Sequence, residues 1–135
     1  MALPSVGGGY QVGDGNVNEV QLLAGPAPQA ATSTATLTAA QVTGEWLVAN
    51  PSTSAATYTL PTAAALDAVL VNAKVGSTFD LFIVNTGTSS GTVTLSMGTG
   101  ITDGGNAAVA VAVTSSAMFR FRKTGDAAYS VYKIA

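Results

Sequence analysis

The sequence predicts an all-β protein, a jelly-roll-like β-sandwich or barrel with one short helix and an extended N-terminal arm. Three observations lead to this fold class. Short runs rich in Thr and Val recur about every ten residues from Thr32 onward, and these residue types fit the pleated surface of a strand. One segment alone has helical spacing, and the first 31 residues are rich in Gly, Asn, Pro and Gln. At 135 residues the chain fits a single domain.

Residues 1–31 are expected to form the arm, which leads into a β-sandwich domain at residues 32–135. The triple glycine at 7–9 gives the backbone freedom, and Gly25-Pro26-Ala27-Pro28 opposes helix and favours an extended or turning path. Apolar residues are scattered along this segment, among them Leu3, Val6, Tyr10 and Val12.

Eight strands are expected in the domain. Proline fixes φ and lacks an amide donor, so Pro51 separates the early strands. Connections are expected at residues 86–91 and at residues 124–126, the latter a hairpin between the last two strands. The expected strands are residues 34–38, 45–49, 57–60, 79–85, 92–97, 108–114, 118–123 and 129–134.

Alternation within these runs predicts which side chains are buried. Residues 92–97 alternate apolar with polar side chains, giving one dry and one wet face. The same period places Phe119 and Phe121 opposite Arg120 and Arg122. Residues 79–84 are almost continuously apolar, which is typical of a central strand covered on both faces.

One segment departs from the β pattern and predicts a helix at residues 63–74. Thr62 can cap its N-terminus, and Gly76 is placed to end it. No long-period repeat is visible along the chain. The apolar residues that fall at helical spacing are Leu66, Val69, Leu70 and Ala73.

Charge is the most informative property of the composition. Charged residues make up 9% of the chain, far below the usual ~25%. Such a chain hides part of its surface or wets it with Thr, Ser, Asn and Gly. The net charge of −2 gives no basis for nucleic-acid binding, since only Arg120, Arg122 and Lys123 cluster. The apolar runs are too short to span a membrane, and the beginning of the sequence lacks a basic signal region, so we expect synthesis in a cytoplasm.

Catalysis is not expected. The sequence has no His and no Cys, which excludes the common triads, and its seven acidic residues are scattered. Asp14-Gly15-Asn16 and Asp103-Gly104-Gly105-Asn106 lack the ligand series of a calcium loop, so both are interpreted as turns. Trp46 and Tyr58 could form a sugar-stacking platform, although a core or rim position is the simpler interpretation. We therefore predict no enzyme activity, no catalytic residues, no metal site and no cofactor.

Four stretches carry a resemblance to a known class of proteins. Together they resemble virion structural proteins of tailed bacteriophages, and most of all the capsid decoration (cement) proteins. The resemblance extends over about residues 43–134 and is one of style and order. The stretches are Thr43-Gly-Glu-Trp-Leu-Val, Tyr58-Thr-Leu-Pro-Thr-Ala, Val75-Gly-Ser-Thr-Phe-Asp-Leu-Phe-Ile-Val-Asn and Gly91-Thr-Val-Thr-Leu-Ser-Met-Gly-Thr-Gly.

The resemblance implies a homotrimer on the outside of the phage head, made in the host cytoplasm, that stabilises the shell by bridging subunits of the major capsid protein. The arm would lie across neighbouring capsid subunits, with Leu3, Val6, Tyr10 and Val12 in contact with the shell. Three joined arms would bind with high avidity. We place Arg120 and Arg122 at the subunit interface, where they would pair with acids of a neighbouring subunit; the other interpretation is that they face water. A head-fibre or tail receptor-binding β-module is the alternative function, since related modules occur there.

Overall fold

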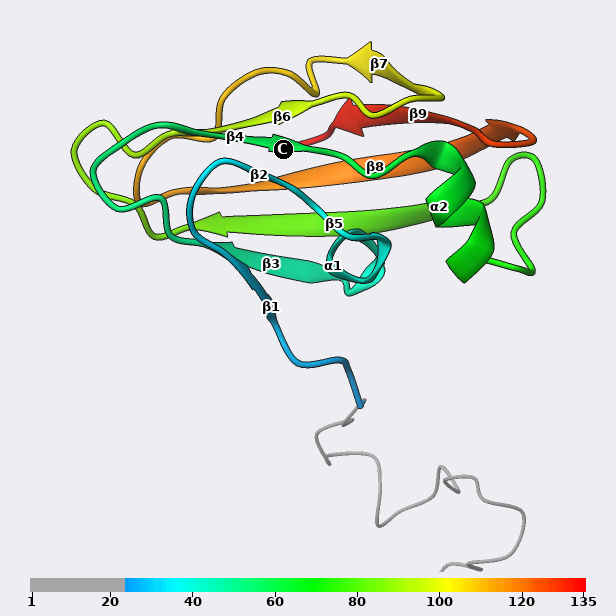
Figure 1. Cartoon of the computed structure of the whole chain (residues 1–135), viewed down its shortest axis with the longest axis horizontal. Helices are drawn as coiled ribbons and strands as arrows, with labels where there is room; N and C mark the ends of the chain where they lie inside the picture. The colour runs from blue at the N-terminus through cyan, green and yellow to red at the C-terminus, as the bar shows by residue number, and fades with distance from the viewer. Residues whose placement is uncertain (1–23) are drawn as a thin grey trace, which may run out of the picture.

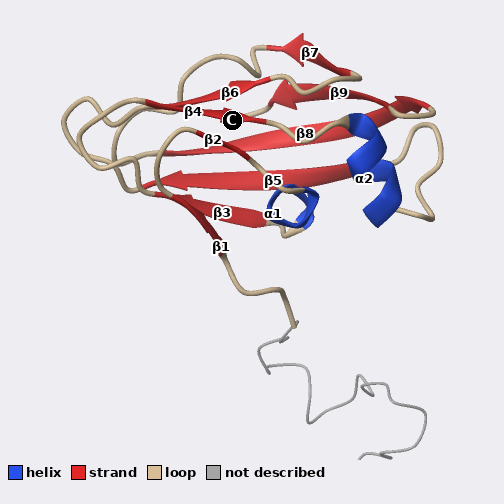
Figure 2. Ribbon diagram, in the orientation of Figure 1, coloured by secondary structure: helices blue, strands red, loops and turns tan. Residues whose placement is uncertain are grey.

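In the computed structural model of this chain, the structure describes residues 24–135. Two β-sheets face each other around one core, and Figures 1 and 2 label their strands. The mostly-β prediction is therefore confirmed. The elements in chain order are β1 (Gln29–Ala31), β2 (Ala35–Thr36), α1 (Ala39–Thr43), β3 (Trp46–Ala49), β4 (Ala56–Thr59), α2 (Ala63–Val69), β5 (Thr78–Asn85), β6 (Val93–Ser96), β7 (Ile101–Gly105), β8 (Ser116–Gly125) and β9 (Ala128–Lys133).

The chain winds between the two sheets. The large sheet has the order β1-β3-β5-β8-β9-β7, and the small sheet has the order β2-β4-β6. From β1 to β6, successive strands alternate between the sheets, and each new strand pairs in parallel with the previous strand of its own sheet. The first two thirds of the domain thus form three stacked parallel coils. Among the described strands, only β5–β8 and β8–β9 pair antiparallel.

This winding corrects the jelly-roll assignment. A jelly roll is built from antiparallel pairs, whereas β1–β3–β5 and β2–β4–β6 are parallel. Antiparallel neighbours need only a tight turn, but parallel neighbours need a crossover. Here each crossover passes through a strand of the opposite sheet, so short strands recur along the sequence much as they do in a jelly roll.

The coils also reveal a sequence repeat that the sequence analysis did not find. Residues 36–40 read Thr-Leu-Thr-Ala-Ala, and residues 59–64 read Thr-Leu-Pro-Thr-Ala-Ala. Both stretches leave the small sheet at the same place, where the Leu37 amide donates to the Thr59 carbonyl. The repeat is hard to see because its spacing is uneven: Gln29, Leu47 and Ile83 are equivalent positions on the large sheet, and the second interval is about twice the first.

Two helices occur instead of one. α1 was not predicted, although Thr38 and Gln41 form a capping box at its start, a signal that is legible in the sequence. α2 begins as predicted with the Thr62 hydroxyl accepting from the Ala65 amide, but it ends at Val69 rather than at residue 74. Only its first turns find a buried surface, through Ala63 and Leu66. The two helices lie side by side, where the chain passes from the small sheet to the large one (Figure 2).

Three strand predictions need correction. Residues 108–114 form no strand, because the Asn85 side-chain amide binds the carbonyls of Val111 and Ala112, leaving an isolated bridge between Val93 and Val111. β7 was not predicted, since its residues alternate poorly and include two glycines. β1 lies inside the stretch assigned to the arm and pairs with β3, so the paired part of the chain begins at Gln29. The predicted hairpin between β8 and β9 is confirmed.

The core lies between the sheets. Its largest fully buried side chains include Tyr58, Phe119, Phe121 and Tyr129. Phe79 stacks on Phe121, with ring centroids 4.7 Å apart. The inward direction of Phe119 and Phe121 fixes the outward direction of the residues between them, and that outward face carries the candidate interaction surface.

Candidate interaction surface

The outer face of the large sheet brings together the two arginines that were placed at an interface. On β8, Ala117, Phe119 and Phe121 are buried, whereas Arg120 and Arg122 are exposed. The alternation predicted for this strand is therefore confirmed. Lys123, which the sequence grouped with the arginines, is 6% exposed and lies on the opposite face of the strand.

Arg120 is paired within its own chain. Asp80 lies directly opposite it on β5, and the guanidinium donates from Nε to Oδ1 at 2.8 Å and from Nη2 to Oδ2 at 3.0 Å. This fork-to-fork contact is the strongest form of such a pair. The guanidinium lowers the pKa of the Asp80 carboxyl, and Asp80 in turn raises the pKa of Arg120. Arg120 therefore has a carboxylate partner without a neighbouring subunit.

A row of apolar side chains crosses the same face next to this ion pair. Trp46 of β3 is in register with Phe82 of β5, and Phe82 is in register with Met118 of β8. Ile134 follows beside Met118, whose carbonyl accepts from the Ile134 amide. We call Trp46, Phe82, Met118 and Ile134 the apolar row. Trp46 is 39% exposed, Phe82 45% and Ile134 53%, while Met118 is half-buried.

The exposure of Phe82 corrects the prediction that β5 is covered on both faces. Leu81 and Ile83 are buried, as an inward face requires, but Phe82 and its outward neighbour Asp80 are not. Asp80 was the signal that could have revealed this, because a charged residue two positions from Phe82 marks the same face of the strand as wet.

The two aromatic residues considered for a sugar platform lie apart. Trp46 is on the outer face, where its indole Nε1 donates to the Pro26 carbonyl at 3.3 Å. Tyr58 is fully buried between the sheets, and its hydroxyl donates to the Thr32 carbonyl at 3.1 Å. Burial raises the pKa of Tyr58. Tyr58 is thus a core residue, and the aromatic neighbour of Trp46 is Phe82.

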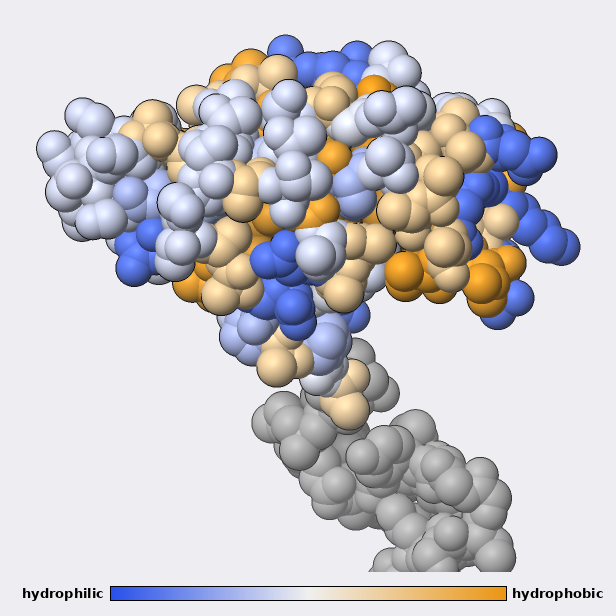
Figure 3. Space-filling model, in the orientation of Figure 1, coloured by the Kyte–Doolittle hydropathy of each residue, from blue (hydrophilic) through white to orange (hydrophobic). Residues whose placement is uncertain are grey.

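A second apolar surface lies at the end of α2 and in the loop that follows it. Figure 3 shows orange atoms gathered there, below and beside α2. The exposed fraction of the side chain is 50% for Val69, 77% for Val71 and 64% for Val75. The loop therefore offers apolar side chains to a partner at a place separate from the apolar row.

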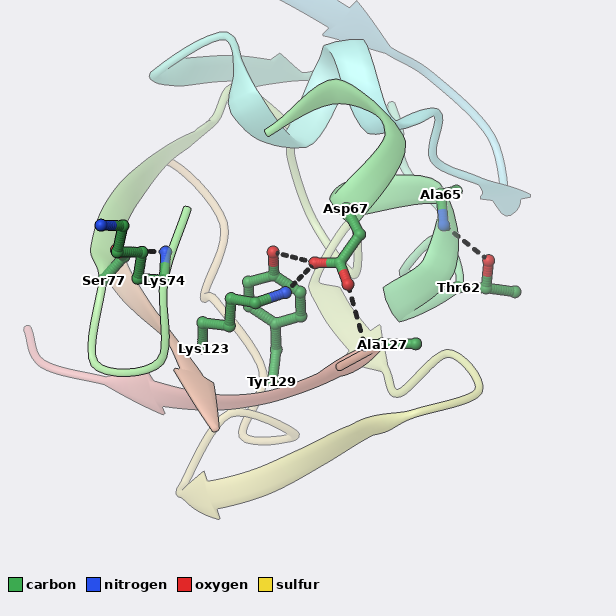
Figure 4. Close-up of polar contacts among 8 residues, drawn as sticks. All are labelled: Thr62, Ala65, Asp67, Lys74, Ser77, Lys123, Ala127 and Tyr129. Atoms are coloured by element: carbon green, nitrogen blue, oxygen red, sulfur yellow. Dashed lines mark hydrogen bonds and ion pairs between the residues drawn. The ribbon is translucent and has the colours of Figure 1, made fainter. Parts of the chain in front are cut away.

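The titratable groups with the largest shifts form a structural cluster near α2. Asp67 of α2 is ion-paired with Lys123, accepts from the Tyr129 hydroxyl at 2.7 Å and accepts from the Ala127 amide at 2.8 Å (Figure 4). These bonds, that from Lys123 first, lower the pKa of Asp67 to about 2. Burial and the Asp67 carboxylate raise the pKa of Tyr129. The cluster links α2 to the β8–β9 hairpin, and the side chains of Asp67, Lys123 and Tyr129 are bonded within it.

The described residues offer no grouping of three or more His, Cys, Asp or Glu side chains that could hold a metal ion. The turn predicted for residues 103–106 is wrong for its first three residues, because Asp103 lies in β7; its carboxylate accepts from the amides of Gly105, Ala107 and Ala108 and so holds the turn that follows the strand. Those bonds lower its pKa. Residues 14–16 lie outside the described part of the chain.

The arm residues Leu3, Val6, Tyr10 and Val12 also lie outside residues 24–135, so their assignment to a capsid contact stays a prediction. Within residues 24–135, no helix has both the length and the apolar character needed to cross a membrane.

Comparison with known proteins gives no relative. No family model matches this chain, and neither a curated protein nor a solved structure matches it.

Proposed function

We propose that this chain is a virion structural protein of a tailed bacteriophage: a capsid decoration (cement) protein that binds the outside of the head shell as a homotrimer and bridges subunits of the major capsid protein. On this proposal the protein acts by contact area. It needs no cofactor, catalyses no reaction, and binds neither nucleic acid nor membrane. The resemblance carried by residues 43–134 supports the proposal.

One observation carries the proposal further than the resemblance does. A chain with very few charges exposes apolar side chains at two separate places, the apolar row and the loop of Val69, Val71 and Val75. A protein that must contact both its own copies and a shell needs two such surfaces. Exposed apolar clusters of this kind mark interaction sites more often than bare solvent surface.

The arm supplies a third contact in this proposal. A standard interface buries roughly 800 Å² per partner, which a segment of this length could provide. Three arms joined in one trimer raise the effective concentration of each at the shell, so individually weak contacts give stable decoration.

The test is binding to undecorated, expanded phage shells. The full chain and a variant lacking residues 1–23 are mixed with shells, and occupancy is measured by sedimentation and by cryo-electron microscopy of the particles. Residues 24–31 are kept because β1 pairs with β3 and Pro26 accepts from Trp46. We expect density at threefold sites for the full chain and loss of binding for the truncated one.

A variant with four substitutions in the arm serves as the matched test. Replacing Leu3, Val6, Tyr10 and Val12 together by Ser keeps the length of the arm and should also abolish decoration. Full occupancy by the truncated chain would rule out the arm mechanism, and density on a tail or vertex instead of the head would rule out the cement function.

A head-fibre or tail receptor-binding β-module is the second candidate. The observation that favours it is that Trp46 and Phe82 are exposed next to each other on one face of the sheet, because aromatic rings of this kind can stack on sugars. Binding of the isolated protein to a glycan array, lost in Trp46→Ala, would support this candidate against the first.

A further inference from the structure

The apolar row is continuous across three hydrogen-bonded strands and the residues that follow β9. Its members are in register on β3, β5 and β8, and Ile134 extends the row past the end of β9. Val48 and Val84, the next outward pair along β3 and β5, are half-buried and widen the row. Single exposed apolar residues need no explanation, but a contiguous row does.

The charges beside the row limit what can cover it. Asp80 and Arg120 form an ion pair with each other, so together they place no net charge next to the apolar row. A nucleic acid or an anionic lipid surface would need clustered cations, and this face has Arg122 as its one further cation within the described residues. A sugar would need polar groups directed at its hydroxyls, and those nearest the row are already bonded to each other.

Two oppositely charged residues, on or next to the strands that carry the apolar row, have no ion-pair partner among the described residues. Among the described residues, the ion pairs are Arg120–Asp80 and Lys123–Asp67, and Arg122 and Glu45 are two of the six charged side chains outside these pairs. Both are exposed. Glu45 immediately precedes Trp46 of β3, and Arg122 lies on β8, with β5 between these strands. Two strand spacings separate β3 from β8, or about 10 Å, so the charges occupy different flanks of the face.

We propose that a second copy of this chain covers the apolar row, in a head-to-tail contact where Arg122 of one copy pairs with Glu45 of the next. Joining different patches of identical chains is the contact type that closes rings such as trimers. In a head-to-tail contact the acid of one copy meets the base of the next copy. Within a single chain, Glu45 and Arg122 lie too far apart to pair. The inference rests on the homotrimer of the proposed function and assigns the surface where its subunits meet.

The first test measures assembly of the purified full chain by analytical ultracentrifugation, without shells. Phe82→Ser removes the central side chain of the row, and we expect the dissociation constant of the oligomer to rise at least about 30-fold, as for a central interface residue. Val109→Ser is the matched control. Val109 has similar exposure, 52%, but lies in the loop after β7, so its replacement should leave the oligomer unchanged.

The second test exchanges the charges. Glu45→Lys and Arg122→Glu should each weaken assembly about tenfold, and the double variant should restore it, since opposite charges then meet again. Both residues are exposed, so this test remains decisive even where Phe82→Ser impairs folding. Thermal unfolding of each variant is recorded alongside.

Three results would overturn the inference: a monomeric full chain, an unchanged oligomer in Phe82→Ser, or no rescue in the double variant. Loss of the oligomer on removing residues 1–23, with the row variants unaffected, would assign the contact to the arm instead. The assembly test uses no shells, so its outcome is separate from that of the decoration test. A trimer that depends on the apolar row but does not decorate shells would contradict the proposed function and support this inference.

Discussion

Replacing the buried Asn85 by Asp should destabilise the domain strongly at neutral pH. Asn85 is 2% exposed at the end of β5, and its Nδ2 donates to three carbonyls, those of Gly91 at 2.9 Å, Val111 at 3.1 Å and Ala112 at 3.0 Å. Its Oδ1 accepts from the Gly87 amide at 2.8 Å. One side chain thus holds together two segments of irregular backbone, the loop that contains Gly87 and Gly91 and the stretch of Val111 and Ala112.

The magnitude follows from these contacts. The Asp variant keeps the bond from Gly87 but loses both amide hydrogens, and its second oxygen then faces three carbonyl oxygens. A lost hydrogen bond costs roughly 1 kcal/mol, and each buried group left without a partner adds about 1–3 kcal/mol. We expect a loss of about 3–5 kcal/mol in the free energy of unfolding, a large part of the 5–15 kcal/mol typical of a domain.

The loss should depend on pH in a definite direction. Burial among carbonyl oxygens raises the pKa of the new carboxyl in the folded state above its unfolded value of about 3.9. The variant therefore loses least stability below pH ~4, where the carboxyl is protonated in both the folded and the unfolded state. The loss in the free energy of unfolding grows as the pH rises through the pKa of the folded state.

Urea unfolding at pH 7 and at pH 4 measures this effect. Asn50→Asp is the matched control, because Asn50 is exposed and accepts from the Ser52 amide through the same atom; it should change stability by less than about 0.5 kcal/mol. An Asn85→Asp variant within about 1 kcal/mol of the parent at pH 7 would refute the role given to this side chain.

Three further predictions concern the coils and α2. Gly98→Ala should cost about 1–3 kcal/mol in urea unfolding, because a Cβ there would lie 2.3 Å from the Pro61 carbonyl oxygen, whereas Gly125→Ala, with 3.8 Å to its nearest neighbour, should be tolerated. Asp67→Asn should reduce the loss of stability on acidification. The pKa of Asp67 in the folded protein, about 2, lies below its ordinary 3.8, so the ionised carboxylate contributes fully to stability above pH ~4, and this contribution is lost as the pH falls toward 2. Unfolding measured across that pH range should show a smaller slope for the variant. Thr62→Ala should remove the cap of α2 and cost about 1 kcal/mol in thermal unfolding, and an unchanged melting temperature would contradict the capping role.

The sequence by itself was sufficient for the mostly-β class and for most strands, but not for the way the strands are connected. Period-two alternation decided correctly that Phe119 and Phe121 are buried and that Arg120 and Arg122 are outside, because alternation reports the two faces of a strand directly. The Thr62 cap marked the start of α2. Composition also predicted that function lies in contact surfaces instead of a reactive centre, and this stays a prediction.

Tertiary structure alone decided which strands are neighbours and which outer face is bare. Pairing of β3 with β5 joins residues far apart in the sequence, and alternation contains no information about that choice. Parallel winding set Trp46 beside Phe82, and the antiparallel β8 set Arg120 beside Asp80. A side chain's direction is a local property, but its neighbours and its exposure depend on what the rest of the chain places against it.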